Sequence, residues 1–414
     1  MDRRLFLMSS VAGIAAPVSP LIELAAPAPG PVTSSGDEKF DAWSKDFVAR
    51  AAAAGWPEAA LRDQLKDLTF DPAVIDADHR QPEVSRSIGD YMRSAVSDDR
   101  LSTGRQKRME MAGVLAAIQA KYGVASDVLI GIWALESNFG AGQGEYDVIR
   151  SLATLAADGR RRDWAEGELY AALRILLTRQ AGRGQLKGSW AGAMGQTQLE
   201  PSVFLTRAVD GDGDGKADIW GSAADALASA ANILGHSGWL RDGSWAREVL
   251  LPQGFDYALA EGPRQPPAWW ADKGVRRADG AAWGAADQSA PFGLIVPAGA
   301  GGPAFLVGTN HFVIRTYNNS TSYALAVGLI ADGIAGATPV SVPWPAEPPL
   351  SRDDRFGAQQ ALAALGYDVG EVDGVIGLKT RAALRAWQTK QGLPADGHLT
   401  PDLAAQLQQQ ATTH

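Results

Sequence analysis

The 414-residue chain has no cysteine and only five histidines. Without cysteine it cannot form a disulfide, a thiolate metal site, a cysteine nucleophile or a lipid anchor on cysteine. The histidines are scattered and show no spacing typical of a zinc site. Excess positive charge is also lacking, because 38 Lys and Arg residues face 47 Asp and Glu residues. A nucleic-acid binder shows the opposite balance, so we expect no nucleic-acid partner.

Long apolar runs are missing after the first 28 residues, and no stretch approaches the about 18 apolar residues of a membrane-spanning helix. Residues 1–28 carry Arg3-Arg4 before Phe6-Leu7, then an apolar run and small residues, a pattern typical of an export signal. The arginine pair resembles a twin-arginine signal, and a Sec signal with two incidental arginines is the alternative. We therefore expect a soluble, monomeric protein of the periplasm.

Between residues 38 and 336 the chain is rich in alanine, and apolar residues recur at helical spacing. Residues 262–313 are instead rich in Gly, Pro and Trp, and predict loops with a few short strands such as Phe305–Val307 and Phe312–Ile314. The main helices are expected at Phe40–Ala54, Glu58–Leu65, Gln106–Tyr122, Asp127–Glu136, Ala165–Arg179, Ala223–Ser237 and Tyr323–Ile334.

Two linkers are expected on either side of this region. Residues 29–37 contain Pro, Gly, Ser and Thr and lack apolar periodicity. Residues 337–350 are rich in proline, which favours a semi-rigid extended segment. A compact unit over residues 351–410 follows, with helices expected at Arg355–Leu365, Lys379–Gln391 and Pro401–Gln409.

Glu136 is the strongest candidate for acid–base chemistry. It lies one and two turns after Ile132 and Val128, so it shares their apolar stripe on the expected helix. A carboxyl group on a buried face loses hydration and holds its proton to higher pH, which is the state that a general acid needs. Taken alone, a glutamate near a helix end usually reaches water.

Four segments in order resemble the lytic murein transglycosylase B family. They are Asp78–Glu83, Gly131–Gly140 around Glu136, Lys187–Ser202, and Arg315–Ser320 with the following Tyr323–Val327. The resemblance covers about residues 38–336. It implies a mainly α (α+β) fold, with a lysozyme-like helical catalytic domain and small β or loop insertions. It also implies cleavage of the MurNAc–GlcNAc β-1,4 bond of peptidoglycan to 1,6-anhydro-MurNAc ends, without water and without a cofactor.

The same resemblance implies roles for four further residues. Ser189 would hydrogen-bond the Glu136 carboxyl, and Gln198 would contact sugar or orient the reacting ring. Tyr317 and Asn318 would orient substrate or stabilise the oxocarbenium-like state. Local pattern alone favours loop capping for Ser189 and Gln198.

A second catalytic carboxylate, which glycoside hydrolases normally need, has no recognisable position in this pattern. Glu145, Asp147 and Glu200 are candidates by proximity in sequence only. A muramidase that adds water to the same bond is therefore one alternative, and a non-catalytic peptidoglycan-binding protein is another.

An acidic loop has ligand spacing like that of an EF-hand. Residues suited to positions 1, 3, 5, 7 and 9, the seventh through its carbonyl, are Asp210, Asp212, Asp214, Lys216 and Asp218. The position of the closing glutamate is Gly221, and the resemblance suggests that Asp225 closes a lengthened loop instead. We expect a structural Ca²⁺ here, with a solvated acidic turn as the alternative.

Residues 351–410 resemble the peptidoglycan-binding domain 1 family. The matching features are Leu365–Tyr367, Val372–Gly377, Trp387-Gln388 and Leu393–Gly397. The resemblance implies a small three-helix domain whose partner is the peptidoglycan glycan strand. Such a module raises the effective concentration of substrate near the catalytic domain.

Overall fold

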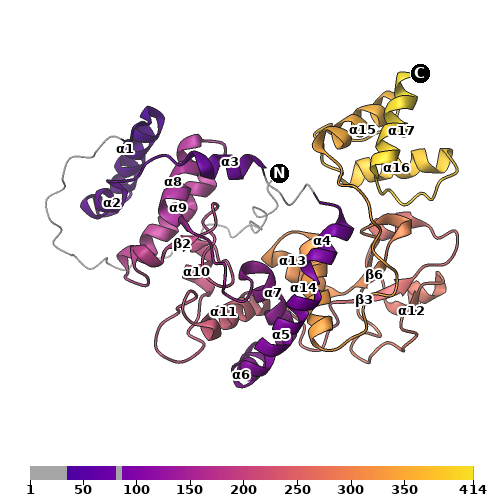
Figure 1. Ribbon diagram of the computed structural model, residues 1–414, viewed down its shortest axis with the longest axis horizontal. Coiled ribbons are helices and arrows are strands. Elements are labelled where there is room, and N and C mark those ends of the chain that lie inside the picture. The colour runs from indigo at the N-terminus through magenta and orange to yellow at the C-terminus, as the bar shows by residue number, and fades with distance from the viewer. Residues whose placement is uncertain (1–34, 81–85, 414) are drawn as a thin grey trace.

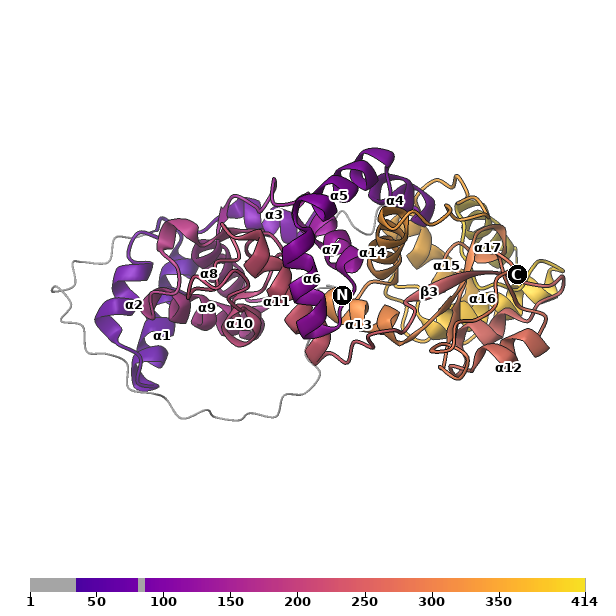
Figure 2. The same cartoon turned by 90° about the horizontal axis from the view of Figure 1, so that it is seen from below.

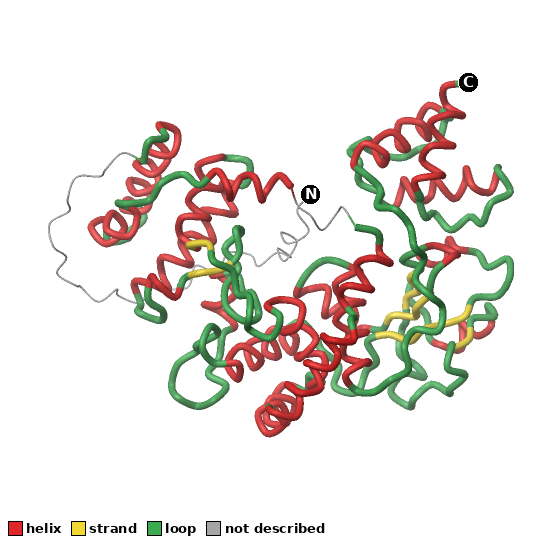
Figure 3. Tube along the Cα trace, in the orientation of Figure 1, coloured by secondary structure: helices red, strands yellow, loops and turns green. Residues whose placement is uncertain are grey.

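The computed structural model describes residues 35–80 and 86–413. The predicted export signal, residues 1–28, lies outside the described residues, as does most of the 29–37 linker. Helices dominate, and the few strands form two separate groups, a two-stranded ribbon in the lobe that contains α8 and α9 and a four-stranded sheet nearer the C-terminal helices (Figure 3). The molecule is elongated, with α1 and α2 at one end and α15–α17 towards the other (Figure 2).

The first lobe is built from two separate parts of the chain, residues 38–80 and 146–207 (Figure 1). Its elements are α1 (Glu38–Ala53), α2 (Glu58–Leu65), α3 (Pro72–Arg80), α8 (Val148–Asp158), α9 (Arg162–Leu177), α10 (Pro201–Arg207), the 3-10 turn η3 (Arg183–Gln185) and the two-stranded ribbon β1 (Tyr146–Asp147) with β2 (Lys187–Gly188). The aromatic face of α1, with Trp43 stacked on Phe47, packs into the core that α8 and α9 share. This lobe holds the ribbon that leads into the loop 188–200.

The central lobe surrounds the helix that carries Glu136. It contains α4 (Ile88–Ala95), α5 (Asp98–Glu110), α6 (Ala112–Tyr122), α7 (Ser126–Ser137), α11 (Ala223–His236), α13 (Thr309–Tyr317) and α14 (Thr321–Ile334). Helices α7 and α14 pack closely (Figure 1) because Gly131 lacks a side chain. A Cβ added at Gly131 would lie 2.8 Å from the carbonyl oxygen of Val327. The two backbones therefore meet directly.

A four-stranded antiparallel sheet follows, in the order β4-β3-β6-β5. The strands are β3 (Ala246–Leu250), β4 (Arg276–Arg277), β5 (Gly293–Ile295) and β6 (Ala304–Val307), accompanied by α12 (Pro267–Asp272) and the 3-10 turns η4 (Tyr257–Glu261) and η5 (Gly299–Gly301). Trp270 of α12 is buried against this sheet, and its indole N–H donates to the Phe292 carbonyl at 3.0 Å. The sheet is the main β insertion in the helical fold.

The C-terminal unit has three helices, α15 (Arg352–Ala364), α16 (Leu378–Lys390) and α17 (Pro401–Thr412), around the buried Trp387. Two buried glutamines hold its turns. Gln359 accepts the backbone N–H of Gly374 at 2.7 Å, and Gln388 accepts that of Gly397 at 2.9 Å. Each glutamine thus fixes the Asp-Gly turn that follows its helix.

The proline-rich segment 337–350 contains no helix or strand, and several of its residues contact the sheet. Glu248 of β3 accepts the backbone N–H groups of Ser341 and Val342 at 2.8 and 2.9 Å. Trp344 stacks on Phe305 of β6 with ring centroids 6.1 Å apart. These contacts hold the segment against the sheet ahead of the C-terminal unit.

Two sequence expectations about single elements were wrong. The stretch Gln106–Tyr122 is divided at Met111, whose backbone angles of −106° and 17° end α5 and begin α6. Phe312–Ile314, expected as a short strand, lies inside α13. Val313 and Ile314 are buried within that helix, and a short apolar run does not distinguish a strand from a buried part of a helix.

Among the described residues, no single helix is both long and apolar enough to cross a bilayer. Helices α6 and α7 reach that length and composition only as a pair, and the pair is bent by 111°.

Candidate active site

Glu136 lies near the C-terminal end of α7, where the helix emerges from the core. The expected apolar stripe is wrong in detail, because residues 128–134 are buried on every side of the helix. Glu136 itself is half-buried. The chain then turns through Asn138, Phe139 and Gly140, all with positive φ, of 49°, 60° and 86°. Two successive non-glycine residues in this region are strained, which is a feature common at functional sites.

Tyr323 is a site residue that the sequence reasoning did not single out. Its hydroxyl donates a hydrogen bond of 2.7 Å to Oε1 of Glu136. The ring is buried at 5% exposure. Burial, together with the negative charge of Glu136, raises the pKa of Tyr323 well above its ordinary value. The phenol therefore stays protonated and acts as a donor.

The sequence places Tyr323 in the first turn of a helix, but its position beside Glu136 follows only from the packing of α14 against α7. Ser320 caps α14 by accepting the backbone N–H of Tyr323, which fixes that tyrosine in the first turn. Val327 follows Tyr323 by one turn on α14, and it meets Gly131, which precedes Glu136 by more than one turn on α7. The two helices therefore run antiparallel, and the first turn of α14 lies beside Glu136.

Gln196 links the loop 188–200 to α7 by hydrogen bonds. The indole N–H of Trp133 donates to Oε1 of Gln196 at 3.0 Å, and the Ser137 hydroxyl donates to its carbonyl oxygen at 2.6 Å. Gln196 also donates from Nε2 to the Trp220 carbonyl at 3.1 Å. These bonds fix the loop relative to α7 on both sides of Glu136.

Ser189 and Gln198 both make loop-capping bonds. The Ser189 hydroxyl accepts the backbone N–H of Ala193 at 3.1 Å. Gln198, with a positive φ of 52°, donates from Nε2 to the carbonyls of Gln143 and Gly195, each at 2.9 Å. Both side chains thus stabilise the loop conformation. The predicted contacts of Ser189 with Glu136 and of Gln198 with sugar stay predictions.

Tyr317 joins α13 to the same loop. Its hydroxyl donates to the Thr197 carbonyl at 2.6 Å. Burial first, and the nearby negative charge of Glu136 second, raise the pKa of Tyr317 above its ordinary range. Asn318 ends α13 with extended backbone angles of −145° and 115°. The structure therefore places Tyr317 within the electrostatic influence of Glu136, and the substrate role of Asn318 stays a prediction.

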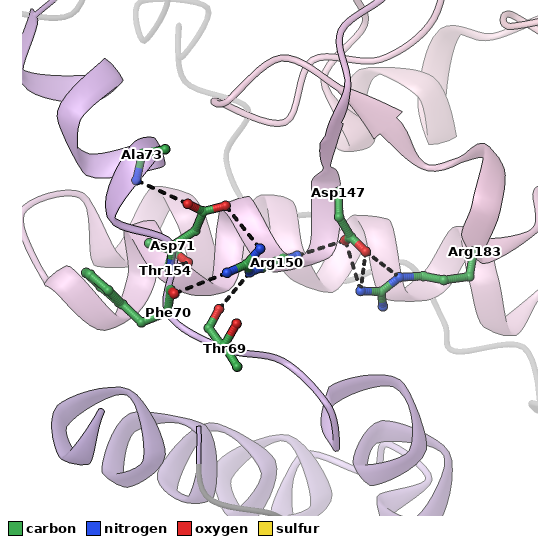
Figure 4. A network of polar contacts seen from close by, with 8 residues as sticks. All are labelled: Thr69, Phe70, Asp71, Ala73, Asp147, Arg150, Thr154 and Arg183. Carbon is green, nitrogen blue, oxygen red and sulfur yellow. Dashed lines mark hydrogen bonds and ion pairs between the residues drawn. The ribbon is translucent and has the colours of Figure 1, made fainter. Parts of the chain in front are cut away.

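The other nearby carboxylates have different surroundings from Glu136. Glu145 is exposed and pairs with Lys187 at 3.2 Å. Asp147 caps α8 and is held by Arg183 at 2.8 Å, in the network that Figure 4 shows. Glu200 is the N-terminal cap residue of α10. Of the four, Glu136 alone has a described bond from a buried phenol.

The acidic loop brings together three of its six predicted ligands. Asp210, Asp212 and Asp214 each place a carboxylate oxygen within 4.8 Å of the others. Backbone N–H groups of Gly215 and Gly213 lower the pKa of Asp210, so it stays charged. Three carboxylates so close together repel, and hard oxygen ligands suit Ca²⁺.

The remaining predicted ligands make other contacts. Asp225 is buried and accepts backbone N–H groups of the loop itself, from Gly211 at 2.7 Å and Asp218 at 2.7 Å. Asp218 accepts the backbone N–H of Trp220 at 3.0 Å. Lys216 donates its backbone N–H to Asp214 at 2.8 Å. Their roles as metal ligands stay predictions.

Comparison with known proteins decides the family. Residues 39–332 match the transglycosylase SLT domain. The chain belongs to this family. Residues 351–407 match a peptidoglycan binding domain. The mainly helical, lysozyme-like fold and the resemblance seen in the sequence are thereby confirmed.

Several relatives of the family are similar to this chain. Membrane-bound lytic murein transglycosylase B of Escherichia coli (strain K12) is 28% identical over 259 residues, which are 59% of this chain and 66% of that protein. The chain thus aligns with slightly less than two thirds of this relative. A crystal structure of SltB3 from Pseudomonas aeruginosa in complex with NAG-anhNAM-pentapeptide is 44% identical, with a TM-score of 0.85, and covers 90% of this chain and 100% of that chain.

A second structure of SltB3, in complex with NAG-NAM-pentapeptide, has a TM-score of 0.86 at the same identity and coverage. The Escherichia coli lytic transglycosylase Slt35 in complex with calcium is 25% identical, with a TM-score of 0.60, and covers 72% of this chain and 93% of that chain.

Proposed function

We propose that the protein is a peptidoglycan lytic transglycosylase that cleaves the MurNAc–GlcNAc β-1,4 bond and leaves 1,6-anhydro-MurNAc ends. The observation that carries the proposal is the half-buried Glu136 carboxyl, held by the buried Tyr323 hydroxyl at 2.7 Å. Family membership over residues 39–332 and the saccharide complexes of SltB3 support it.

One carboxyl group can complete this reaction in two steps. Protonated Glu136 gives its proton to the glycosidic oxygen, the C1–oxygen bond breaks, and the MurNAc ring becomes oxocarbenium-like. The Glu136 carboxylate then takes the proton of the C6 hydroxyl of the same sugar, whose oxygen bonds to C1. The acid is regenerated, and no water enters. Since Tyr323 donates to Oε1, Oε2 is the oxygen assigned to the proton.

Product mass separates this reaction from hydrolysis. Digestion of purified sacculi should release products one water lighter than reducing MurNAc ends, and reducing ends instead would favour the muramidase alternative. The variant Glu136→Gln should lower turnover by at least about 10², the scale of acid–base catalysis. The exposed Glu145 provides the matched control. Glu145→Gln should leave turnover unchanged, and unchanged turnover in Glu136→Gln would favour a non-catalytic wall-binding protein.

We also propose that a structural Ca²⁺ binds the acidic loop. Asp210, Asp212 and Asp214 would hold it, with the Lys216 carbonyl, Asp218 and Asp225 as the further predicted ligands. A calcium complex of the related Slt35 supports this assignment. The ion would neutralise the clustered charge and stabilise the loop, and it takes no part in the proton transfers.

The remaining proposals concern where the protein acts. We expect export to the periplasm, a monomeric state and anchoring to glycan strands by the C-terminal module. The N-terminal pattern of residues 1–28 and the peptidoglycan binding domain match over 351–407 support these expectations. Fractionation of cells would test the location, and sedimentation of the protein with sacculi would test the anchoring.

A further inference from the structure

Gln196 is a buried residue beside the candidate active site, and the proposed proton transfers do not involve its amide. It is 6% exposed, and its backbone and side chain use four polar groups. The backbone N–H donates to the Ile219 carbonyl at 2.9 Å, and Nε2 donates to the Trp220 carbonyl at 3.1 Å. Oε1 accepts the Trp133 indole N–H at 3.0 Å, and the backbone carbonyl accepts the Ser137 hydroxyl at 2.6 Å. Because a buried amide bonded at both ends cannot turn over without losing these bonds, the side chain has one orientation.

Two of these bonds reach α7 next to Glu136. Trp133 precedes Glu136 by three residues, about one turn of the helix, and Ser137 follows it directly. Residues three apart are neighbours on a helix surface. The Trp133 bond therefore fixes α7 at the level of Glu136, and the Ser137 bond fixes the backbone just after it. The position from which the Glu136 side chain extends is set between these two bonds.

The same network supports the strained turn that follows α7. The Ser137 hydroxyl, which donates to Gln196, also accepts the Gly140 N–H at 2.8 Å. A Cβ added at Gly140 would lie 2.7 Å from Oε1 of Gln196, so the amide packs directly against the turn. Asn138 and Phe139 have positive φ, which non-glycine residues keep only where the surrounding contacts impose it. Gln196 supplies such contacts at the start and at the end of the turn.

The loop that carries Gln196 is also held by bonds that do not involve its side chain. The carbonyl of Thr197 accepts the Tyr317 hydroxyl at 2.6 Å. Met194 and Leu199 exchange two backbone hydrogen bonds, each of 2.8 Å. Loss of the Gln196 amide should therefore change the contacts with α7 and leave the fold of the loop in place.

We propose that Gln196 is a positioning residue for the acid–base chemistry, because it sets where the end of α7 places the Glu136 carboxyl. The inference rests on the proposed function and deepens it, since Gln196 acts through Glu136 and not on the sugar. A carboxyl in place accepts the Tyr323 hydroxyl through Oε1 and leaves Oε2 for the glycosidic oxygen. A displacement of about 1 Å at a reacting group can lower a rate about 10²-fold. Gln196 therefore affects proton transfer and the bond between Glu136 and Tyr323 together.

Kinetics of Gln196→Met give the first test, because methionine keeps the length of the side chain and removes its amide. On soluble glycan strands released from sacculi by an amidase, kcat should fall about tenfold or more with KM little changed. The alkaline limb of the pH–rate profile should move to higher pH, because a displaced carboxyl loses the Tyr323 bond that favours its ionised form. In a Tyr323→Phe background the same substitution should move the limb no further, since both changes remove one interaction. A raised KM with an unmoved limb, or equal shifts in both backgrounds, would overturn the proposal.

Gln119→Met is the matched control, because it makes the same change at the opposite end of α7. The Gln119 amide oxygen accepts the hydroxyl of Ser126, the first residue of α7, about 15 Å along the helix from Glu136. This variant should keep the kcat and the pH profile of the wild type. Ser137→Ala makes a smaller change in the network and decides the matter if Gln196→Met does not fold. It should show the same fall in kcat and the same shift of the limb, and wild-type kinetics would then overturn the proposal.

Hydrogen exchange gives a second test that needs no turnover. Exchange of the backbone N–H groups of residues 138–140 should rise about tenfold in Gln196→Met, the scale of one lost hydrogen bond, and stay unchanged in Gln119→Met. Unchanged exchange in Gln196→Met would overturn the proposal even if kcat fell. Reducing ends from the wild type would count against the proposed reaction alone, because hydrolysis also begins with protonation of the glycosidic oxygen and the kinetic comparison still holds. If the wild type released no product, catalysis itself would fail, and exchange at 138–140 would still decide whether Gln196 holds the turn.

Discussion

The hydroxyl of Tyr323 donates to Oε1 of Glu136 across the contact between α14 and α7, at 2.7 Å. Tyr323 belongs to the first turn of its helix and Glu136 to the last turn of the other, so antiparallel packing brings them together. The bond fixes which carboxyl oxygen faces the buried ring. It also stabilises the carboxylate that forms after the first proton transfer.

Removing that hydroxyl should change both the rate and its pH dependence. Tyr323→Phe should lower kcat about tenfold or more, since a hydrogen bond to a charged group contributes about 1.5–3 kcal/mol. The bond favours the ionised carboxyl, so its loss should move the alkaline limb of the pH–rate profile to higher pH. Tyr317→Phe is the matched comparison, because that hydroxyl donates to the Thr197 carbonyl. It should lose activity without moving the limb, and an equal shift in both variants would argue against a specific role for Tyr323.

The close approach of Gly131 to Val327 predicts an unusual effect of alanine in a helix. Gly131→Ala should destabilise the protein by about 1–3 kcal/mol, because the new Cβ would press against a backbone oxygen. Gly167, an exposed residue inside α9, has no atom within 4 Å of an added Cβ. Gly167→Ala should stabilise by about 0.5–1 kcal/mol through helix propensity. Denaturation of both variants with urea tests the pair, and similar changes of one sign would show that packing at Gly131 is loose.

These contacts also show what the sequence could and could not predict. Motif order located Glu136 and the loop 188–200, and apolar periodicity located most of the long helices. The role of Tyr323 could not be predicted without the packing of α14 on α7, which depends on the contact between Gly131 and the Val327 carbonyl. The aromatic face of α1 was visible only as residue types, and the hydrogen bonds of the buried Gln359 and Gln388 could not be read from the sequence. Their partners lie far along the chain or in turns that they create.

The buried carboxyl of Glu168 should make stability depend on pH. Burial raises its pKa above the ordinary 4.5, although the Ser202 N–H and hydroxyl that donate to it work in the opposite direction. A raised pKa means that its stabilising contribution is complete below about 4.5 and is lost as pH rises through the folded-state value. Glu168→Gln should therefore gain stability relative to the wild type as the pH rises above about 4.5. Parallel stability curves for the two proteins would contradict this assignment.

Calcium should stabilise the fold through the acidic loop. At about 100 times its Kd, a ligand that binds only the folded state adds about 2.7 kcal/mol, which raises Tm by several degrees. Chelation should remove this gain, and Asp212→Asn should abolish the response because it removes one carboxylate from the group of three. Asp242→Asn, at an exposed carboxylate outside the loop, should respond like the wild type. If chelator leaves the Tm of the wild type unchanged, the loop is a solvated acidic turn.

Glu261 should hold the C-terminal module against the sheet region. It lies at the end of η4 and forms ion pairs with Arg381 and Arg385 of α16. Burial works to raise the pKa of Glu261, but hydrogen bonds from Arg385 and Arg381 outweigh it and keep the pKa below its ordinary value. The contribution of this contact is therefore present above the ordinary pKa and is lost as pH falls through the lowered one.

Replacement of that carboxylate should release the module without unfolding it. Besides Glu261, the module is contacted by the Ala300 N–H, which donates to Asp396 at 2.8 Å, and by Glu347 of the proline-rich segment, which pairs with His398 at 2.9 Å. Glu261→Gln should raise hydrogen exchange at residues 337–350 and increase the radius of gyration in solution scattering, with the Tm of each unit preserved. Glu371→Gln, a change at an exposed carboxylate of the module, should leave both unchanged. Unaltered exchange in Glu261→Gln would mean that the contacts of Glu248 with the proline-rich segment, and of Trp344 within that segment, suffice to fix the module.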